Sequence, residues 1–186
     1  MRKVFAFEVA TVDGYYVGPN QEFDWPVVDR EFDEFSLRQL EEVDTLLFGR
    51  VTYEMMASYW PTPAAREGDP RTAAAMNDLP KLVASRTLDK VEWENSRLVD
   101  GDVAEELASL KRQPGKDIAI IGSFDLTVSL LRAGLVDELR IMVCPLLLGD
   151  GLSLFRTAPG RTGLKLLDVR RFDSGNVLLT YEPAAR

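Results

Sequence analysis

The chain has 186 residues, of which 46% are hydrophobic and 28% charged, and this is enough length and apolar content for one folded domain. Its net charge of −8 argues against a nucleic-acid partner or an anionic membrane surface, because both would be repelled over much of the molecule. One cysteine and no histidine exclude an intrachain disulfide, Ser-His-Asp and Cys-His catalysis and the commonest zinc ligand, so we expect no metal site.

The N-terminal region is predicted to form a strand followed by a long loop. Residues 4–11 are typical of a strand, and Asp13-Gly14 is a turn signal. Glu8 interrupts the apolar run too early for a signal peptide, and no run reaches the roughly 18 to 20 apolar residues of a membrane span. We therefore expect a cytoplasmic protein. The loop that follows holds Trp25, and long loops are usually functional.

A helix and then a strand joined to a second helix are predicted next. Apolar residues at helical spacing indicate a helix over about residues 30–43. Residues 45–49 read as a buried strand that passes through glycine into a helix, which Pro61 ends. A helix that begins at a glycine offers free N–H groups and a dipole to an anion. Arg50 and Thr52 add a cation and a hydroxyl donor, although an ordinary connection with a solvated arginine is the alternative.

The remaining elements alternate until the last third of the chain. Residues 62–71 are predicted to be a mobile surface segment. Helices are then expected over residues 72–78, 102–112 and onward from 124, and strands over 80–84, 91–93, 97–99, 118–121, 139–143, 164–172 and 176–182. The last two strands flank the turn 173–176 as a hairpin. This order predicts a single α/β domain over residues 1–186, with a mixed, mostly parallel sheet covered on both faces.

Three of the expected strands end in the same way, with glycine or polar residues. These ends are Gly49-Arg50, Ser85-Arg86 and Gly122-Ser123. In open α/β sheets ligands bind outside the carboxyl ends of strands, so the three ends together indicate an extended cofactor such as a dinucleotide. Arg50, Thr52, Ser85 and Arg86 are the residue types that bind a 2′-phosphate. The G-x-G-x-x-G fingerprint is absent, so a standard Rossmann domain is not expected.

Several segments resemble the dihydrofolate-reductase-like superfamily in sequence and in order. Residues 48–54 look like the Gly-Arg-x-Thr segment of dihydrofolate reductases, residues 82–88 like their third strand, and residues 118–123 like their Gly-Gly strand end. Residues 130–139 and 145–151, with Phe155, are closer to the reductase domain of bifunctional riboflavin-biosynthesis enzymes. The resemblance covers nearly the whole chain. It implies a dihydrofolate-reductase-like three-layer α/β/α fold that binds NADPH.

The resemblance also implies roles for individual residues. Gly49, Arg50 and Thr52 would contact cofactor phosphates, Ser85 and Arg86 the adenosine 2′-phosphate, and Gly122 and Ser123 the pyrophosphate and nicotinamide side, with Phe124, Asp125 and Leu126 opening the next helix over the cofactor. The family usually has Gly-Gly, often with a cis peptide, where this chain has Gly122-Ser123. The side chain of Ser123 therefore leaves open both a cis bond and a close backbone approach.

A proton donor and a substrate pocket follow from the same resemblance. Dihydrofolate reductases use one acidic side chain on the helix before the Gly-Arg strand, because hydride addition to a C=N bond needs protonation at nitrogen. Asp33 falls at the matching place, although it also belongs to an acidic first helical turn that stabilises the helix dipole without catalysis. Trp25 would cap the substrate pocket or anchor packing, and Tyr53 would reach the substrate or pack under the sheet.

These residues together predict an NADPH-dependent reductase that transfers hydride to a pteridine- or pyrimidine-type small molecule. The resembling riboflavin enzymes reduce a ribosylaminouracil phosphate, yet no second arginine cluster for a substrate phosphate can be identified in this chain. The alternatives are a dihydrofolate reductase proper and a nucleotide-binding protein without catalysis. Because the resembling riboflavin reductases are commonly dimers, we also expect a homodimer.

Overall fold

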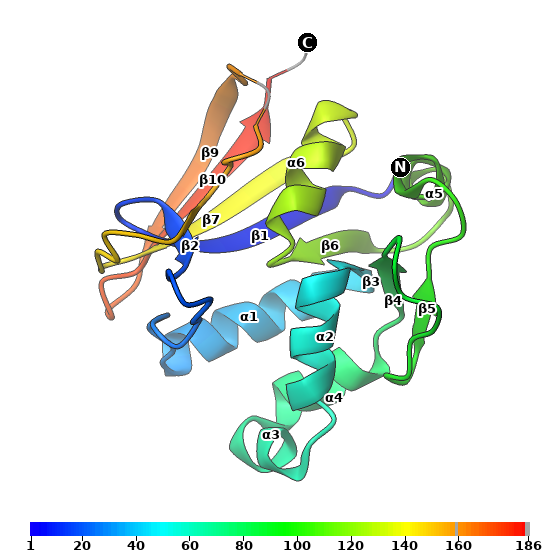
Figure 1. Cartoon of the computed structure of the whole chain (residues 1–186), viewed down its shortest axis with the longest axis horizontal. Coiled ribbons are helices and arrows are strands. Elements are labelled where there is room, and N and C mark those ends of the chain that lie inside the picture. Colours follow the sequence, from blue (N-terminus) through cyan, green and yellow to red (C-terminus); the bar gives the residue numbers. More distant parts are fainter. Residues whose placement is uncertain (159, 185–186) are drawn as a thin grey trace.

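The computed structural model describes residues 1–158 and 160–184 and shows one large sheet with helices on both faces (Figure 1). The strands are β1 (Val4–Thr11), β2 (Tyr15–Val17), β3 (Val43–Gly49), β4 (Lys81–Ala84), β5 (Ser96–Leu98), β6 (Asp117–Ile121), β7 (Glu138–Cys144), β8 (Leu152–Ser153), β9 (Leu164–Arg171) and β10 (Val177–Pro183). The helices are α1 (Arg30–Glu42), α2 (Arg50–Tyr59), α3 (Pro63–Gly68), α4 (Pro70–Asp78), α5 (Val103–Lys111) and α6 (Phe124–Arg132).

The order of strands across the large sheet is β5-β4-β3-β6-β1-β7-β10-β9. The first six of these pair in parallel, whereas β10 pairs antiparallel with both β7 and β9. The hairpin between β9 and β10 closes at Gly175, whose φ of 90° suits a residue without a Cβ. The predicted α/β/α fold, with a mostly parallel sheet and an antiparallel C-terminal hairpin, is therefore confirmed.

The central strand β1 is buried along its whole length because it lies between β6 and β7. Its side chains alternate between two hydrophobic cores. Phe5 and Phe7 pack with residues of α1, α2 and α4, whereas Val4 and Ala6 pack with residues of α5 and α6 on the opposite face. Alternate residues of β1 thus anchor the helices on the two opposite faces of the sheet.

Residues 62–71 differ from the prediction of a mobile surface segment, because they form α3 and the start of α4. The side chains of Thr62 and Asp69 each accept a hydrogen bond from the backbone N–H three residues further on. Pro63 and Pro70 occupy the first helical positions, where a missing N–H leaves no hydrogen bond unmade. A capping residue followed by proline is a helix-start signal, and here it outweighs the proline- and glycine-rich composition.

The short strands agree only in part with the prediction. The strand predicted at residues 91–93 is wrong, since Trp93 turns into the core, where its ring stacks on Phe48 and its indole N–H donates to Asn77 at 2.7 Å. The strand predicted at residues 97–99 is confirmed as β5, one residue earlier. The strand β2 forms within the predicted N-terminal loop, and its antiparallel partner β8 lies in a segment for which no element was predicted. Neither strand is long enough to show an alternating pattern in the sequence.

Within residues 1–158 and 160–184, no helix combines the length and the apolar character that crossing a bilayer would require. In the same part of the chain, no three side chains of the His, Cys, Asp or Glu type are grouped to hold a metal ion. The described peptide bonds are all trans, including the bond between Gly122 and Ser123. Gly122 has a φ of 61°, which glycine adopts more readily than other residues.

Candidate cofactor and substrate site

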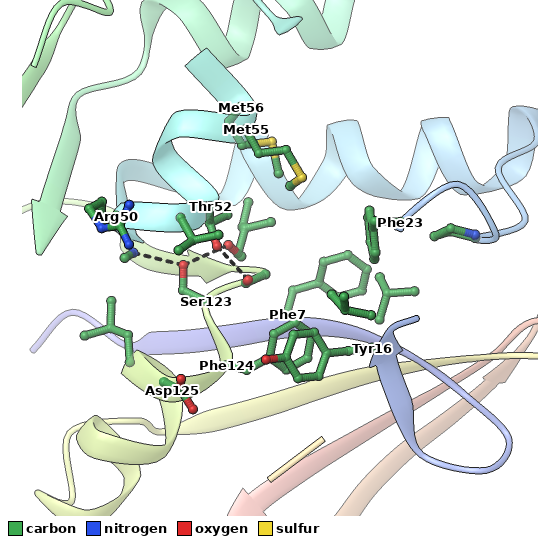
Figure 2. Close-up of a pocket in the computed structure, with 18 of the residues that line it drawn as sticks. Phe7, Tyr16, Phe23, Arg50, Thr52, Met55, Met56, Ser123, Phe124 and Asp125 are labelled. Carbon is green, nitrogen blue, oxygen red and sulfur yellow. Dashed lines mark hydrogen bonds between the residues drawn. The ribbon is translucent and has the colours of Figure 1, made fainter. Parts of the chain in front are cut away.

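A cavity of about 1020 Å³ opens at the carboxyl ends of β3, β4 and β6, which is the edge where α/β sheets bind ligands (Figure 2). All the residues predicted to contact the cofactor line this cavity: Gly49, Arg50, Thr52, Ser85, Arg86, Gly122, Ser123, Phe124, Asp125 and Leu126. Ligand pockets in proteins usually measure roughly 300 to 1,000 Å³. The cavity therefore has room for a large part of a dinucleotide and a second small molecule.

The helices α2 and α6 both begin at this cavity, and no side chain caps either of them. Gly49 precedes α2 and has no side chain, and the hydroxyl of Ser123, which precedes α6, makes no capping bond. The N–H groups in the first turn of each helix therefore have no partner within the helix. With two helix dipoles directed at it, this end of the cavity favours an anionic ligand such as a pyrophosphate.

The two strand-to-helix joints are held together by side-chain hydrogen bonds (Figure 2). The backbone N–H of Gly49 donates to Oγ of Ser123 at 3.0 Å, and Oγ1 of Thr52 donates to the carbonyl oxygen of Gly122 at 2.7 Å. The hydroxyl proton of Thr52 is thus directed at the backbone and not at the cavity. Thr52 and Ser123 position the two helix N-termini relative to each other, a role that the sequence interpretation of Thr52 as a phosphate donor did not include.

Two arginines flank the same end of the cavity. The guanidinium of Arg50 donates to the carboxylate of Glu54 at 2.9 Å, one helical turn further along the exposed side of α2. Oγ of Ser85 accepts hydrogen bonds from the backbone N–H groups of Thr87 and Leu88, and so it orders the turn that carries Arg86. Within the described residues the Arg86 side chain has no hydrogen-bond or ion-pair partner. The charge of Arg86 is therefore available to an anion in the cavity.

A second arginine contact lies over the start of α6. Arg156 donates to the carboxylate of Asp125 at 2.8 Å, and Asp125 also accepts a bond from Oγ1 of Thr157 at 3.2 Å. The ring of Tyr16 stacks on Phe124 with ring centroids 3.7 Å apart. These contacts join β2 and the segment after β8 to the N-terminus of α6. The negative charge of Asp125 is compensated there, so it opposes an anionic ligand less than an isolated carboxylate would.

The other end of the cavity is apolar. In Figure 2, Phe7, Phe23, Met55 and Met56 lie on the side away from Arg50. We call the part of the lining that comes from β1, residues 23–28, α1, residues 55–60 and α4 the apolar chamber: Phe7, Val9, Phe23, Asp24, Pro26, Val28, Phe32, Ser36, Gln39, Leu40, Met55, Met56, Trp60, Thr72 and Met76. The cavity thus joins an anion-binding end to a hydrophobic end.

Comparison with known proteins gives the family. The family model described as the RibD C-terminal domain matches residues 2–178. The chain belongs to the RibD C-terminal domain family. It is 31% identical to the uncharacterized protein YyaP of Bacillus subtilis over 182 residues, which are 97% of this chain and 94% of that protein.

Solved structures show that the RibD C-terminal domain fold is shared more widely. A protein of Shewanella sp. PV-4 that is named for riboflavin biosynthesis is 24% identical and superposes with a TM-score of 0.75, over 98% of this chain and 99% of the other. A dihydrofolate reductase of Enterococcus faecalis complexed with NADP(H) is 16% identical, with a TM-score of 0.60 over 98% of this chain and 97% of that one. The resemblance inferred from the sequence is confirmed at the level of family and fold.

Tyr53, Trp25 and Asp33, which were predicted for the substrate side of this RibD C-terminal domain, do not line the cavity. Tyr53 is buried, and its phenol oxygen accepts hydrogen bonds from the backbone N–H groups of Glu92 and Trp93 at 3.1 and 3.0 Å. Trp25 is half-buried and packs edge-on against Phe23, which lines the cavity in its place. Of the alternatives left open by the sequence, packing therefore describes Tyr53 and Trp25.

Asp33 lies partly buried on α1, outside the residues that line the cavity. Desolvation, followed by the nearby charges of Asp69 and Asp29, raises the pKa of its carboxyl. Asp69 begins α4, so Asp33 lies near the start of that helix. Its predicted role as proton donor is not supported by this placement, although the raised pKa is in the direction that suits a donor.

Sequence reasoning did not include Tyr16, Phe23 or Arg156 in the site. Tyr16 belongs to the three-residue strand β2, and Phe23 to the loop before α1, where no periodic pattern marks a facing residue. Arg156 comes 31 positions after the carboxylate that it contacts. The only usable signal was the length of the loop that holds Phe23, which we interpreted as functional without assigning the residue.

Proposed function

We propose that this protein is a reductase that binds NADPH and transfers hydride to a small pteridine- or pyrimidine-type molecule. The observation that carries the proposal is one cavity with two uncapped helix N-termini and Arg86 at one end and an apolar chamber at the other. An extended ligand with phosphates at one end and a planar ring toward the other fits this arrangement of groups. Membership of the RibD C-terminal domain family agrees with it.

The donor groups of the chain suit the phosphates of that cofactor. The first-turn N–H groups of α2 and α6 would hold the pyrophosphate, since both helix dipoles favour an anion there. Arg50 and Arg86 would bind the 2′-phosphate by charge-assisted hydrogen bonds. When bound, NADPH supplies the hydride. Thr52 and Ser123 would keep the two helix starts at the separation that the cofactor requires.

Binding and turnover are measured separately to test the proposal. Calorimetric titration with NADPH and NADH comes first, followed by the loss of NADPH absorbance with dihydrofolate and a panel of pteridines and uracil derivatives. We expect NADPH to bind and at least one compound to be reduced. If NADPH binds and nothing in the panel is reduced, a nucleotide-binding protein without catalysis is favoured, and turnover of dihydrofolate favours a dihydrofolate reductase proper. If neither cofactor binds, the proposal is wrong.

Asp33→Asn tests whether this carboxyl is the proton donor. Because Asp33 does not line the cavity, we expect kcat for any substrate identified above to change by less than about threefold, in contrast to the 10²- to 10⁴-fold contribution typical of general acids. The matched control is Glu34→Gln, a neighbouring carboxyl on the same turn of α1. A loss of about 100-fold in kcat with unchanged NADPH binding, seen only in Asp33→Asn, would assign the proton to Asp33 after all.

We also propose that the protein forms a homodimer through the edge strand β9. This strand pairs only with β10 in the large sheet, and Leu164, Leu166, Leu167 and Val169 are exposed along it. An edge strand that is apolar and unpaired is a surface that proteins normally cover. We expect light scattering to show a dimer that Leu167→Lys converts to monomer, while Val12→Lys, at an exposed apolar residue elsewhere, leaves it unchanged. A monomeric wild-type protein would contradict this proposal.

A further inference from the structure

The two ends of the cavity differ in charge as well as in polarity. Arg50 follows β3 and Arg86 follows β4, and both strands lie on one side of β6 in the sheet order, with β1 on the other side. The apolar chamber is built on β1, with Phe7 and Val9 in its wall. The third cavity arginine, Arg156, is already paired with Asp125. No arginine or lysine among the described residues belongs to the wall of the apolar chamber.

The only charged side chain at the apolar end, among the described residues that line it, is negative. Asp24 is exposed in the loop before α1. A phosphate in the buried part of the chamber, against Phe7, Leu40 and Met76, would lose hydration without gaining a cation, and Asp24 would repel it. Burial of an unpaired dianion is among the least favourable events in protein chemistry. The chamber therefore disfavours the binding of a phosphorylated ligand.

The polar groups that remain in the chamber are few and neutral. The hydroxyls of Ser36 and Thr72 line the wall and make no hydrogen bond to another described residue. The amide oxygen of Gln39 is engaged by Arg140 at 3.2 Å. Around these groups the wall consists of aromatic, methionine and aliphatic side chains. Such a surface binds a planar apolar ring and offers it one or two hydrogen bonds.

We propose that the substrate of this reductase is an uncharged, planar ring compound of the proposed pteridine or pyrimidine type that carries no phosphate. This inference rests on the proposed function, in which NADPH fills the other end of the cavity. When bound, NADPH would supply a hydride to the carbon of a polar double bond in the substrate and be oxidised to NADP⁺, and the atom at the other end of the double bond would take its proton from water. The substrate class thus differs from the ribosylaminouracil phosphate that the family resemblance implied.

A matched pair of probes tests the inference: 2-naphthol and 2-naphthyl phosphate have the same ring system and differ in the phosphate. Calorimetric titrations use protein saturated with NADP⁺, because the bound cofactor then occupies the anion-binding end. We expect 2-naphthol to bind at least about tenfold more tightly than its phosphate. Equal or tighter binding of the phosphate would overturn the inference, and so would a failure of 2-naphthol to bind.

A substituted protein supplies the second arm of the test. Met55→Arg places a cation in the wall of the chamber, and we expect it to strengthen the binding of 2-naphthyl phosphate by about tenfold or more. Ser58→Arg adds the same charge on α2 at a position that does not line the cavity, and should leave both affinities unchanged. If Met55→Arg gives no gain, the probes do not enter the chamber and the inference fails. Failure of NADP⁺ to bind in the first place would instead refute the proposed function.

Discussion

Combined replacement of Arg50 and Arg86 by alanine is expected to raise the Kd of NADPH by about 100-fold or more, while the Kd of NADH rises less than about tenfold. The two cofactors differ only in the 2′-phosphate, and a hydrogen bond to a charged group contributes about 1.5 to 3 kcal/mol. Arg86 should account for most of the effect, because Arg50 is already paired with Glu54. Titration calorimetry with both cofactors measures the discrimination directly.

Salt dependence and a matched variant separate this effect from a general change in charge. The difference between wild type and the double variant should shrink as ionic strength rises, since exposed charges are screened by salt. Arg30→Ala removes one positive charge from an exposed side chain of α1 that does not line the cavity, and should change neither Kd. Equal losses of NADPH and NADH affinity would show that the arginines contact a phosphate common to both cofactors.

Glu8→Gln is expected to flatten the pH dependence of stability more than any other single substitution of a carboxyl. Glu8 lies on β1 with no exposed surface, and burial raises the pKa of its carboxyl from 4.5 to about 8. Oε1 accepts a hydrogen bond from Oγ1 of Thr127 at 2.6 Å, whereas Oε2 is buried with no partner among the described residues. The folded protein therefore keeps this carboxyl protonated at neutral pH.

The sign of the effect follows from the two protonation states. The unfolded chain ionises Glu8 near its ordinary pKa and the folded chain only near 8, so the contribution of Glu8 to the free energy of unfolding is highest below pH 4.5. It should fall between those two pH values, by on the order of 5 kcal/mol. Glutamine cannot ionise, so this decline should be absent from urea denaturation of Glu8→Gln, and Glu67→Gln, at an exposed carboxyl, serves as control. Parallel curves for wild type and Glu8→Gln would show that Glu8 is ionised in the fold.

From the strand ends, the sequence predicts which residues line one end of the cavity. The parallel order of β3, β4 and β6 brings Gly49, Ser85 and Gly122 to one edge, and a buried strand followed by glycine is visible in the chain itself. The direction of a hydroxyl is not visible in this way. Thr52 donates its proton to Gly122 because two joints 70 residues apart meet in space, and only the tertiary structure establishes that.

The residues predicted for the substrate side do not line the cavity, for a related reason. Matching Asp33 to a catalytic position assumes that α1 presents the same face to the cavity as in the resembling enzymes. In this structure Phe32 and Ser36 line the cavity, while Asp33 lies outside it. One residue corresponds to about 100° around a helix, so a small difference in alignment changes which side chain faces the ligand. Residues on helices therefore transfer between relatives less safely than glycines at strand ends.

The two hydrogen bonds that join Gly49 to Ser123 and Thr52 to Gly122 have a consequence for the kinetics of binding. They fix the two helix starts relative to each other before any ligand arrives, so little chain entropy would remain to be lost if an anion such as the proposed cofactor binds between them. Association should then proceed in one concentration-dependent step without a slow isomerisation.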